Sequence, residues 1–78
     1  MTDEELRAAI AEHSAVPAEA ITPDANLVQL GISSLEIMRL VTRWRRDGLA
    51  VSFETLVAAP TLGAWAAHFE EIETRAER

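Results

Sequence analysis

The amino-acid sequence predicts an all-α domain, and three observations support this class. Ala, Leu, Glu and Arg, which favour helices, are plentiful, and Tyr is absent. Two S/T-x-x-E sequences mark helix starts, each ahead of apolar residues at helical spacing. The 78-residue chain has no Cys, so helix packing must support it without disulfides or thiolate metal sites. We therefore expect one domain, residues 1–78, forming a four-helix bundle with three main helices, a short third helix and a long first loop.

Charge and hydropathy restrict the possible partners. A net charge of −6 at pH 7 argues against nucleic acid as a partner. No apolar run is long enough for a membrane span or a signal sequence, so we expect a soluble cytoplasmic protein or one domain of a larger synthetase. We also expect it to act as a monomer. The sequence shows no nucleophile–base pair, no paired catalytic carboxylates and no cluster of metal ligands. These absences indicate a protein that is not an enzyme and binds no metal.

The first helix is expected from Asp3 to about Ser14. Thr2 and Glu5 form a capping box at its start. No second His or nucleophile lies near His13 in the sequence, so a structural role at the helix end is favoured over a ligand or a base. The core-facing residues at helical spacing are Leu6, Ala9, Ile10 and His13.

A long connection follows, from Val16 to Ile32. Pro17, Pro23 and Gly31 make it too irregular for a helix and too broken for a strand. Loops of this length in a small domain are usually functional or held in place by packing. We expect this one to be pinned to the core by Val16, Ile21, Leu27 and Leu30.

The second helix is expected to run from Ser34 to about Asp47 and to end at Gly48, a residue suited to a left-handed C-cap. Ser33 and Glu36 match a capping box, so Ser33 is the expected N-cap and Ser34 the first helical residue. At about 100° per residue, one stripe of this helix faces the core. It contains Ile37, Leu40, Val41 and Trp44.

Another side of this helix is a candidate partner surface. Leu35, Met38 and Thr42 would flank Ser34 on an exposed or half-exposed face. Leu35 and Met38 could instead simply widen the core stripe. Four of the seven cationic residues also lie on this helix. They could simply form a solvated face, but we expect Arg39 to belong to the partner surface. They are Arg39, Arg43, Arg45 and Arg46.

The remaining chain predicts a short helix and a final long one. Ser52 can cap a helix over about 53–58, and Pro60 opens the last helix with Thr61 or a neighbour as its cap. His68 falls outside the core stripe of the last helix and should be exposed. That stripe contains Leu62, Trp65, Ala66, Phe69 and Ile72.

Phe53 and Val57 are apolar at i and i+4 on the short helix. With Met38 they would form an apolar patch beside Ser34, where partner enzymes dock. The alternative is that Phe53 is a core residue that closes the bundle.

The spacing L-G-x-x-S-L, with Leu30, Gly31, Ser34 and Leu35 in place, resembles the attachment site of carrier proteins. The resemblance implies a 4′-phosphopantetheine arm, derived from coenzyme A, on Ser34. A hydroxyl at a helix start suits such an anionic group, which the helix dipole favours by roughly 0.3–1 kcal/mol. Family members usually have Asp before the modified serine. Here Ser33 takes that place, and it can cap the helix but carries no charge.

Three further segments, R-W-R-R-x-G, V-x-F-x-x-L and P-T-L-x-x-W, narrow the resemblance. Together they are similar to the aryl carrier domains of nonribosomal peptide systems, notably those attached to isochorismatases in siderophore assembly. This implies an acyl group, often an aryl acid, held as a thioester. The implied partners are a phosphopantetheinyl transferase, an adenylation enzyme for an aryl or amino acid, and a condensation domain or other acyl-accepting enzyme.

Two alternatives stay open. An acyl carrier for fatty-acid or polyketide synthesis would share the attachment motif, although such carriers generally present an acidic second helix and this one is basic. Peptidyl carriers share much of the aryl pattern. From another class, a helical interaction module without a prosthetic group would need only the bundle.

Overall fold

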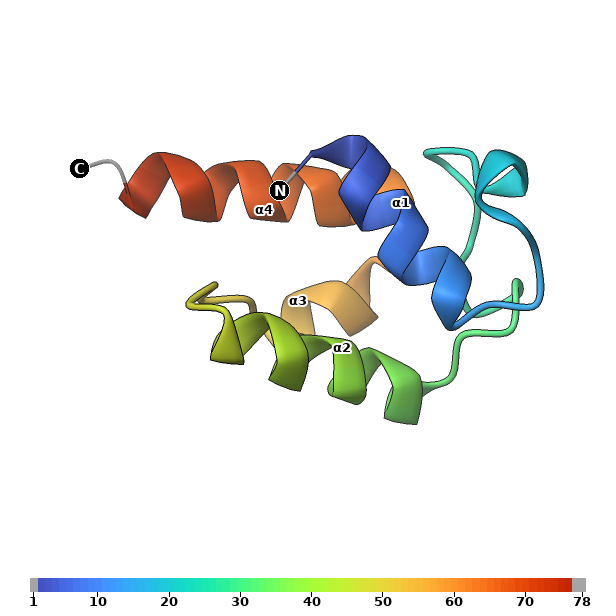
Figure 1. Cartoon of the computed structure of the whole chain (residues 1–78), viewed down its shortest axis with the longest axis horizontal. Helices are drawn as coiled ribbons and strands as arrows, with labels where there is room; N and C mark the ends of the chain where they lie inside the picture. Colours follow the sequence, from blue (N-terminus) through green and yellow to red (C-terminus); the bar gives the residue numbers. More distant parts are fainter. Residues whose placement is uncertain (1, 77–78) are drawn as a thin grey trace.

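The computed structural model describes residues 2–76, the last of them by its backbone alone, and within this range the chain is helical without strands. The expected all-α bundle is confirmed. In Figure 1, α1 and α4 lie along one side of the molecule, α2 along the other, and α3 between α2 and α4. The elements are α1 (Asp3–Glu12), a 3-10 turn (Ala18–Ala20), α2 (Ser34–Arg46), α3 (Phe53–Ala58) and α4 (Leu62–Ala76). The proposed domain limits, 1–78, include three residues outside the described part.

The helix starts lie where the sequence predicts them. At α1 the capping box is complete, because the Thr2 hydroxyl accepts from the Glu5 backbone N–H and the Glu5 carboxylate accepts from that of Thr2, both at 3.1 Å. At α2 the Ser33 hydroxyl accepts from the Glu36 N–H at 3.3 Å. A full capping box would also have the Glu36 carboxylate accept from the Ser33 backbone N–H, and this bond is absent among the described residues. The Glu36 carboxylate accepts from the Ser33 hydroxyl instead.

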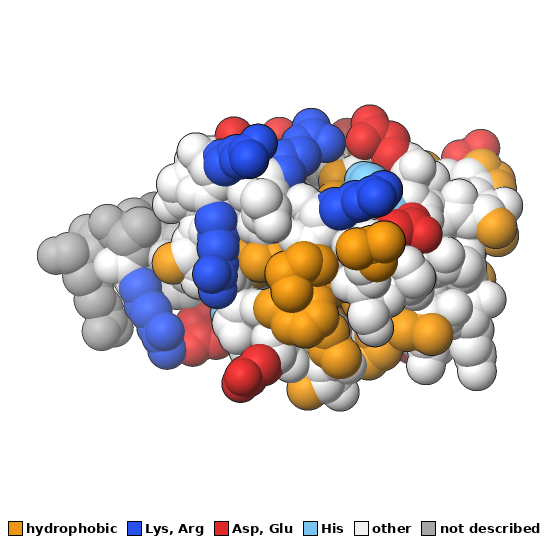
Figure 2. All heavy atoms as spheres, turned by 90° about the horizontal axis from the view of Figure 1, so that it is seen from below, with side chains coloured by type: hydrophobic (Ala, Val, Ile, Leu, Met, Phe, Trp, Pro, Cys, Tyr) orange, Lys and Arg blue, Asp and Glu red, His pale blue; other side chains and the backbone are white. Residues whose placement is uncertain are grey.

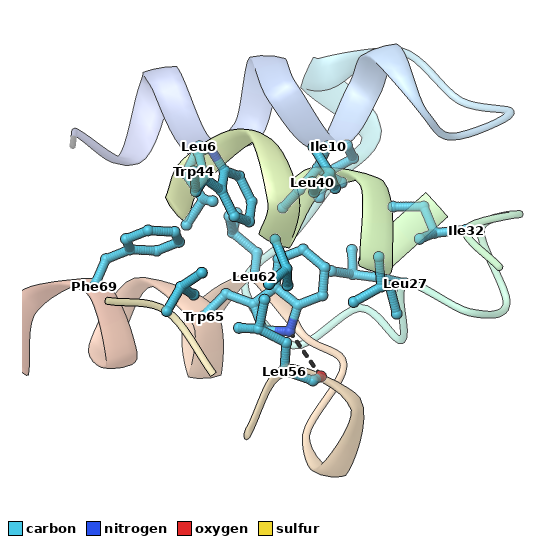
Figure 3. Close-up of a cluster of buried hydrophobic side chains, with 14 of the residues drawn as sticks. Leu6, Ile10, Leu27, Ile32, Leu40, Trp44, Leu56, Leu62, Trp65 and Phe69 are labelled. Carbon is cyan, nitrogen blue, oxygen red and sulfur yellow. Dashed lines mark hydrogen bonds between the residues drawn. The ribbon is translucent and has the colours of Figure 1, made fainter. Parts of the chain in front are cut away.

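Two tryptophans and a phenylalanine form the centre of the core (Figure 3). The ring of Trp44 meets Trp65 edge to face, with centroids 6.2 Å apart. The predicted core stripe of α2 is fully buried, and so is that of α4 except for half-buried Ala66. On α1, Leu6 and Ile10 are buried while Ala9 and His13 are half-buried. Helix packing therefore supports this chain, as the composition predicts.

The long connection is held against the core along its length. Ile21 and Leu27 are fully buried, as expected, and Ile32 joins them. Val16 and Leu30 are half-buried against the same core. The backbone N–H of Leu27 donates to the Pro60 carbonyl at 2.7 Å, which fastens the loop to the segment before α4. The expectation of no helix in this connection is wrong at one place, the short 3-10 turn.

Two side chains of α4 hold α3. The indole N–H of Trp65 donates to the Leu56 carbonyl at 3.0 Å (Figure 3). The imidazole Nε2 of His68 accepts from the backbone N–H of Ser52 at 3.1 Å. The expectation that His68 is exposed is therefore wrong, since its ring is half-buried beside the start of α3. The helical period places it off the core stripe, but the chain segment before α3 folds back over it.

No helix in the described part of the chain is both long and apolar enough to cross a membrane.

Candidate functional site

Ser34 is the first residue of α2, and its side chain is exposed. Ser33 is extended at φ −86° and ψ 165°, so the chain turns into the helix between the two serines. The Ser34 hydroxyl makes no hydrogen bond within residues 2–76. The first N–H groups of any helix lack partners inside that helix, and of these the Ser33 hydroxyl takes the one from Glu36. Ser34 thus combines a free hydroxyl with a local environment that favours an anion.

Gly31 sets the path of the chain into this helix start. Its φ of +101° is a conformation that side chains other than glycine rarely adopt. A Cβ at this position would lie 3.3 Å from both the Cβ and the backbone nitrogen of Ala15. The adjacent Leu30 carbonyl accepts from the Ala15 N–H at 2.9 Å. The loop therefore returns tightly against the end of α1 before Ser33 and Ser34.

The end of α1 and the start of α2 also meet through side chains. The Nδ1 atom of His13 lies 3.7 Å from one carboxylate oxygen of Glu36, and each side chain is about a quarter exposed. The other oxygen of Glu36 accepts from the Ser33 hydroxyl at 3.4 Å. His13 is the C-cap residue of α1, so its expected position at the helix end is confirmed. The structure adds a connection to the helix that bears Ser34.

Leu35 is added here to the three residues expected from the sequence, and from this point the apolar patch means four side chains of α2 and α3: Leu35, Met38, Phe53 and Val57. Leu35 is 61% exposed and Met38 45%, so neither simply widens the core stripe. Val57 is 39% exposed, while Phe53 is half-buried and packs against the core. Figure 2 views the molecule from the α2 side and shows hydrophobic side chains gathered in the middle of this face, with arginines above them and to their left and acidic side chains below and to the right. Contiguous exposed apolar patches are typical of interaction surfaces, so this face is a candidate docking surface.

The cationic residues of α2 differ in their partners. Arg43 lies 3.5 Å from the carboxylate of Glu12, and the Nε of Arg45 donates to the Val51 carbonyl at 3.0 Å. Arg39 is exposed and pairs with no carboxylate of the described residues. The Thr42 hydroxyl donates to the Met38 carbonyl at 2.9 Å, inside its own helix. Arg39 is therefore available to a partner, whereas the Thr42 hydroxyl is already used.

No group of three His, Asp or Glu side chains within residues 2–76 could hold a metal ion. What the fold presents is a free serine hydroxyl at a capped helix start, next to an apolar patch.

The chain belongs to the family described as "Phosphopantetheine attachment site", whose model matches residues 4–69. Members of this family carry a covalently attached 4′-phosphopantetheine and are themselves non-catalytic. The free hydroxyl and open N–H groups at the start of α2 fit such a phosphate-linked group. The resemblance drawn from the motifs is thereby confirmed at the level of the family.

Several curated proteins are similar to the chain. Phenyloxazoline synthase MbtB of Mycobacterium tuberculosis is 53% identical over 60 residues, which are 77% of this chain and 4% of that protein. An isochorismatase of Bacillus subtilis is 41% identical over 64 residues, 82% of this chain and 20% of the relative. Enterobactin synthase component B of Escherichia coli is 35% identical over 75 residues, which cover 83% of this chain and 26% of that protein. An isochorismatase is thus among the relatives, as the sequence motifs predict.

The chain spans about a quarter or less of the length of these three relatives. No solved structure matches it significantly.

Sequence reasoning missed two contacts of the site. One is the Glu36 contact of His13, and the other is the Ser52 contact of His68. Neither has a signal in the helical period, because each depends on how two helices far apart in sequence meet. The position of His13 at a predicted helix end was the only indication for the first.

Proposed function

We propose that Ser34 is the residue that carries phosphopantetheine, and that residues 1–78 are a single carrier domain of nonribosomal peptide synthesis. In this role the domain holds an acyl group, most often an aryl acid, and moves it between an adenylating and a condensing enzyme. The observation that carries the proposal is the exposed, unbonded hydroxyl of Ser34 at the start of α2, in a chain of this family.

Each residue around Ser34 has a part in this proposal. The Ser34 hydroxyl is the group that becomes the phosphodiester oxygen. The first N–H groups of α2 would face that anion, and Ser33 would hold the helix start while leaving them accessible. Gly31 would keep the loop clear of the attachment point. When attached, the arm supplies a terminal thiol that holds the acyl group as a thioester.

The names of the relatives support the aryl type. The name phenyloxazoline synthase contains phenyl, which is an aryl group, and an isochorismatase is among the relatives, as the motifs of the aryl carrier domains led us to expect. The basic surface of α2 supports this over a carrier for fatty-acid or polyketide synthesis, whose second helix is generally acidic. We further propose that the domain works in the cytoplasm as a monomer, since the transferase would draw the arm from coenzyme A there.

The apolar patch and Arg39 would be the docking face for three partners: the phosphopantetheinyl transferase, the adenylating ligase and the acyl-accepting enzyme. Leu35 and Met38 are exposed close to Ser34 along α2, which suits contact with an enzyme that reaches the base of the arm. Arg39, without a carboxylate partner in residues 2–76, would meet an acidic group on such an enzyme. Thr42 lies on the same face and would contribute through its methyl group, because its hydroxyl is bonded within α2.

The test of attachment is intact mass after incubation with coenzyme A and a broad-specificity phosphopantetheinyl transferase. The parent chain should gain one phosphopantetheine, and Ser34→Ala should gain none while keeping its helical circular dichroism. Ser33→Ala is the matched control, because it removes the neighbouring hydroxyl and should leave the site modifiable. An unmodified parent chain, with a competent transferase, would contradict the carrier proposal, and modification at Ser33 would contradict the assigned residue.

A second experiment tests the acyl type. The modified chain is offered to an aryl-acid ligase with a benzoate-like acid, to an amino-acid-activating enzyme, and to a fatty-acyl ligase. The aryl proposal expects the thioester to form fastest with the first. Preferential loading with an amino acid would indicate a peptidyl carrier, and preferential loading with a fatty acid would overturn the assignment to this class.

A further inference from the structure

His68 forms a hydrogen bond that only one of its protonation states can make. Its Nε2 accepts from the backbone N–H of Ser52 at 3.1 Å. A backbone N–H can only donate, so this nitrogen must carry a lone pair, and the ring proton of the neutral imidazole is on Nδ1. A doubly protonated imidazole has N–H groups at both nitrogens and cannot accept here. The contact therefore exists only while His68 is neutral.

The bond holds the first residue before α3. Ser52 is the N-cap of α3, where its hydroxyl accepts from the Thr55 N–H at 3.3 Å. Toward its other end, α3 is held by the bond from Trp65 to the Leu56 carbonyl. The two side chains that hold α3 thus lie one turn apart on α4, at positions 65 and 68. Of the two, the indole bond does not depend on pH, whereas the imidazole bond does.

Few charged groups surround the imidazole. The surface hollow that contains it is lined on α4 by Glu71 and Arg75, which are paired with each other. The facing segment between α2 and α3 and the first turn of α3 contribute only uncharged residues: Gly48, Ala50, Ser52 and Thr55. Arg45 of α2 lines the adjoining hollow, where its Nε is bonded to the Val51 carbonyl. No facing carboxylate from α2 or α3 would compensate a charge on His68 within this lining.

The position of α3 matters because Phe53 and Val57 form half of the apolar patch. Phe53 directly follows Ser52, so a shift of the Ser52 backbone moves the first residue of the patch. A six-residue helix has little stability of its own and depends on its tertiary contacts. Loss of one of the two side-chain bonds from α4 would therefore loosen the patch while the main core stays packed.

We propose that His68 is a positioning residue which, as a neutral imidazole, fixes α3 and the apolar patch, and which releases them when it is protonated. The effect on partners rests on the proposed docking face, whereas the effect on α3 does not. Protonation of the imidazole removes the lone pair that accepts the Ser52 N–H, so docking is expected to weaken at acidic pH once His68 carries the second proton. The expected change in KM for a partner enzyme is about two- to tenfold, which corresponds to one hydrogen bond.

The first experiment follows the Ser52 amide by NMR in the whole ¹⁵N-labelled chain between about pH 7.5 and pH 5.5. The Ser52 resonance should shift together with the His68 ring signals, whereas the Trp65 indole N–H should stay in place. In His68→Gln, whose amide oxygen can accept from Ser52 without titrating, that shift should disappear. His13→Gln is the matched control, because it removes the other histidine and should leave the shift intact. A Ser52 amide that ignores the His68 titration in the parent chain would overturn the proposal, with no variant needed.

The second experiment measures loading of the phosphopantetheine-bearing chain by an adenylating ligase at the same pH values. The rise in KM at low pH should be smaller with His68→Gln than with the parent, with kcat similar for both. Equal KM profiles for the two chains would overturn the link between His68 and docking. If Ser34 proved not to be modified at all, the proposed function would fail, and the amide titration would still decide the role of His68.

Discussion

The ring of Trp44 meets the ring of Phe69 edge to face, with centroids 4.8 Å apart and planes at 85°. This contact joins the helix that begins at Ser34 to the longest helix of the bundle. Both side chains are almost completely buried. Edge-to-face aromatic pairs contribute about 0.5–1.5 kcal/mol beyond the area that they bury.

We expect Phe69→Ala to lower the free energy of unfolding by about 3–5 kcal/mol, because it leaves a cavity at the centre of the bundle. Denaturation followed by circular dichroism measures this loss. Leu35→Ala is the control, since its side chain is 61% exposed and its truncation should stay within about 0.5 kcal/mol. A similar loss for both variants would show that the described core is not the stabilising one.

Ser33 is predicted mainly to cap the start of α2, and its effect on recognition by the transferase is a separate question. Ser33→Ala should lose about 0.5–2 kcal/mol of stability, because the Glu36 N–H loses its acceptor. Ser33→Asp should be as stable as the parent or slightly more stable, since it keeps the cap and adds a charge that the helix dipole favours.

The transferase gives the second measurement on Ser33→Asp. We expect faster modification of Ser34 if the acid usual before this serine contributes to recognition. Slower modification than in the parent would mean that the transferase of this carrier prefers a neutral residue.

Phe53 and Met38 should separate packing from docking. Met38→Ala should leave the melting curve nearly unchanged and slow loading or condensation, because its side chain is 45% exposed. Phe53→Ala should both destabilise the fold and slow loading or condensation, since Phe53 packs partly against the core. Truncating a fully buried Phe lowers the free energy of unfolding by about 3–5 kcal/mol, and we expect a smaller loss here. Variants that fold and turn over at parental rates with every partner would end the docking proposal.

Gly31 and Gly48 form a matched pair for backbone strain. Both have positive φ, at 101° and 91°, so a substitution by Ala is strained by roughly 1–3 kcal/mol at each. Only at Gly31 would the new Cβ also crowd Ala15, whereas at Gly48 nothing lies within 4 Å. Gly31→Ala should therefore be the less stable of the two in thermal unfolding, and the reverse order would contradict the tight return of the loop.

The capping box of α1 predicts a pH dependence in the acid range. The Thr2 backbone N–H, and secondarily the Thr2 side chain, hold the pKa of Glu5 below its usual 4.5. A carboxyl with a lowered pKa stabilises the fold above its unfolded pKa, and this contribution is lost as the pH falls below 4.5. In Glu5→Gln the melting temperature should therefore fall less steeply with acidification. An unchanged slope would show that the box does not persist in solution.

The helices could be predicted from the sequence because their determinants are local. The starts of α1, α2 and α3 are set by their cap residues, Thr2, Ser33 and Ser52. Their buried faces are set by the helical spacing of the apolar residues, and neither signal depends on the rest of the chain. The exposure of Leu35 was open between two interpretations, and it is decided by which parts of the surface of α2 the rest of the fold leaves uncovered.

What could not be predicted depends on contacts between distant segments. Ile32 is buried because the loop turns inward just before α2, which no period indicates. His68 is half-buried because the chain before α3 lies against it, and Glu36 contacts His13 because the ends of two helices meet. The free hydroxyl of Ser34 was predictable only in part. Its position at a helix start follows from the local sequence, whereas its lack of contacts with other side chains depends on the whole fold.

The burial of both indoles has a practical consequence. With Trp44 and Trp65 in the core and no Tyr in the chain, the intrinsic fluorescence arises wholly from the interior. Emission should therefore report unfolding without a label, and it should stay blue-shifted when a protein binds over α2. The indole N–H of Trp65 is bonded to α3, so a change in emission without loss of helicity would signal that α3 has moved. The chain thus contains its own optical probe for the one element whose position we propose to be adjustable.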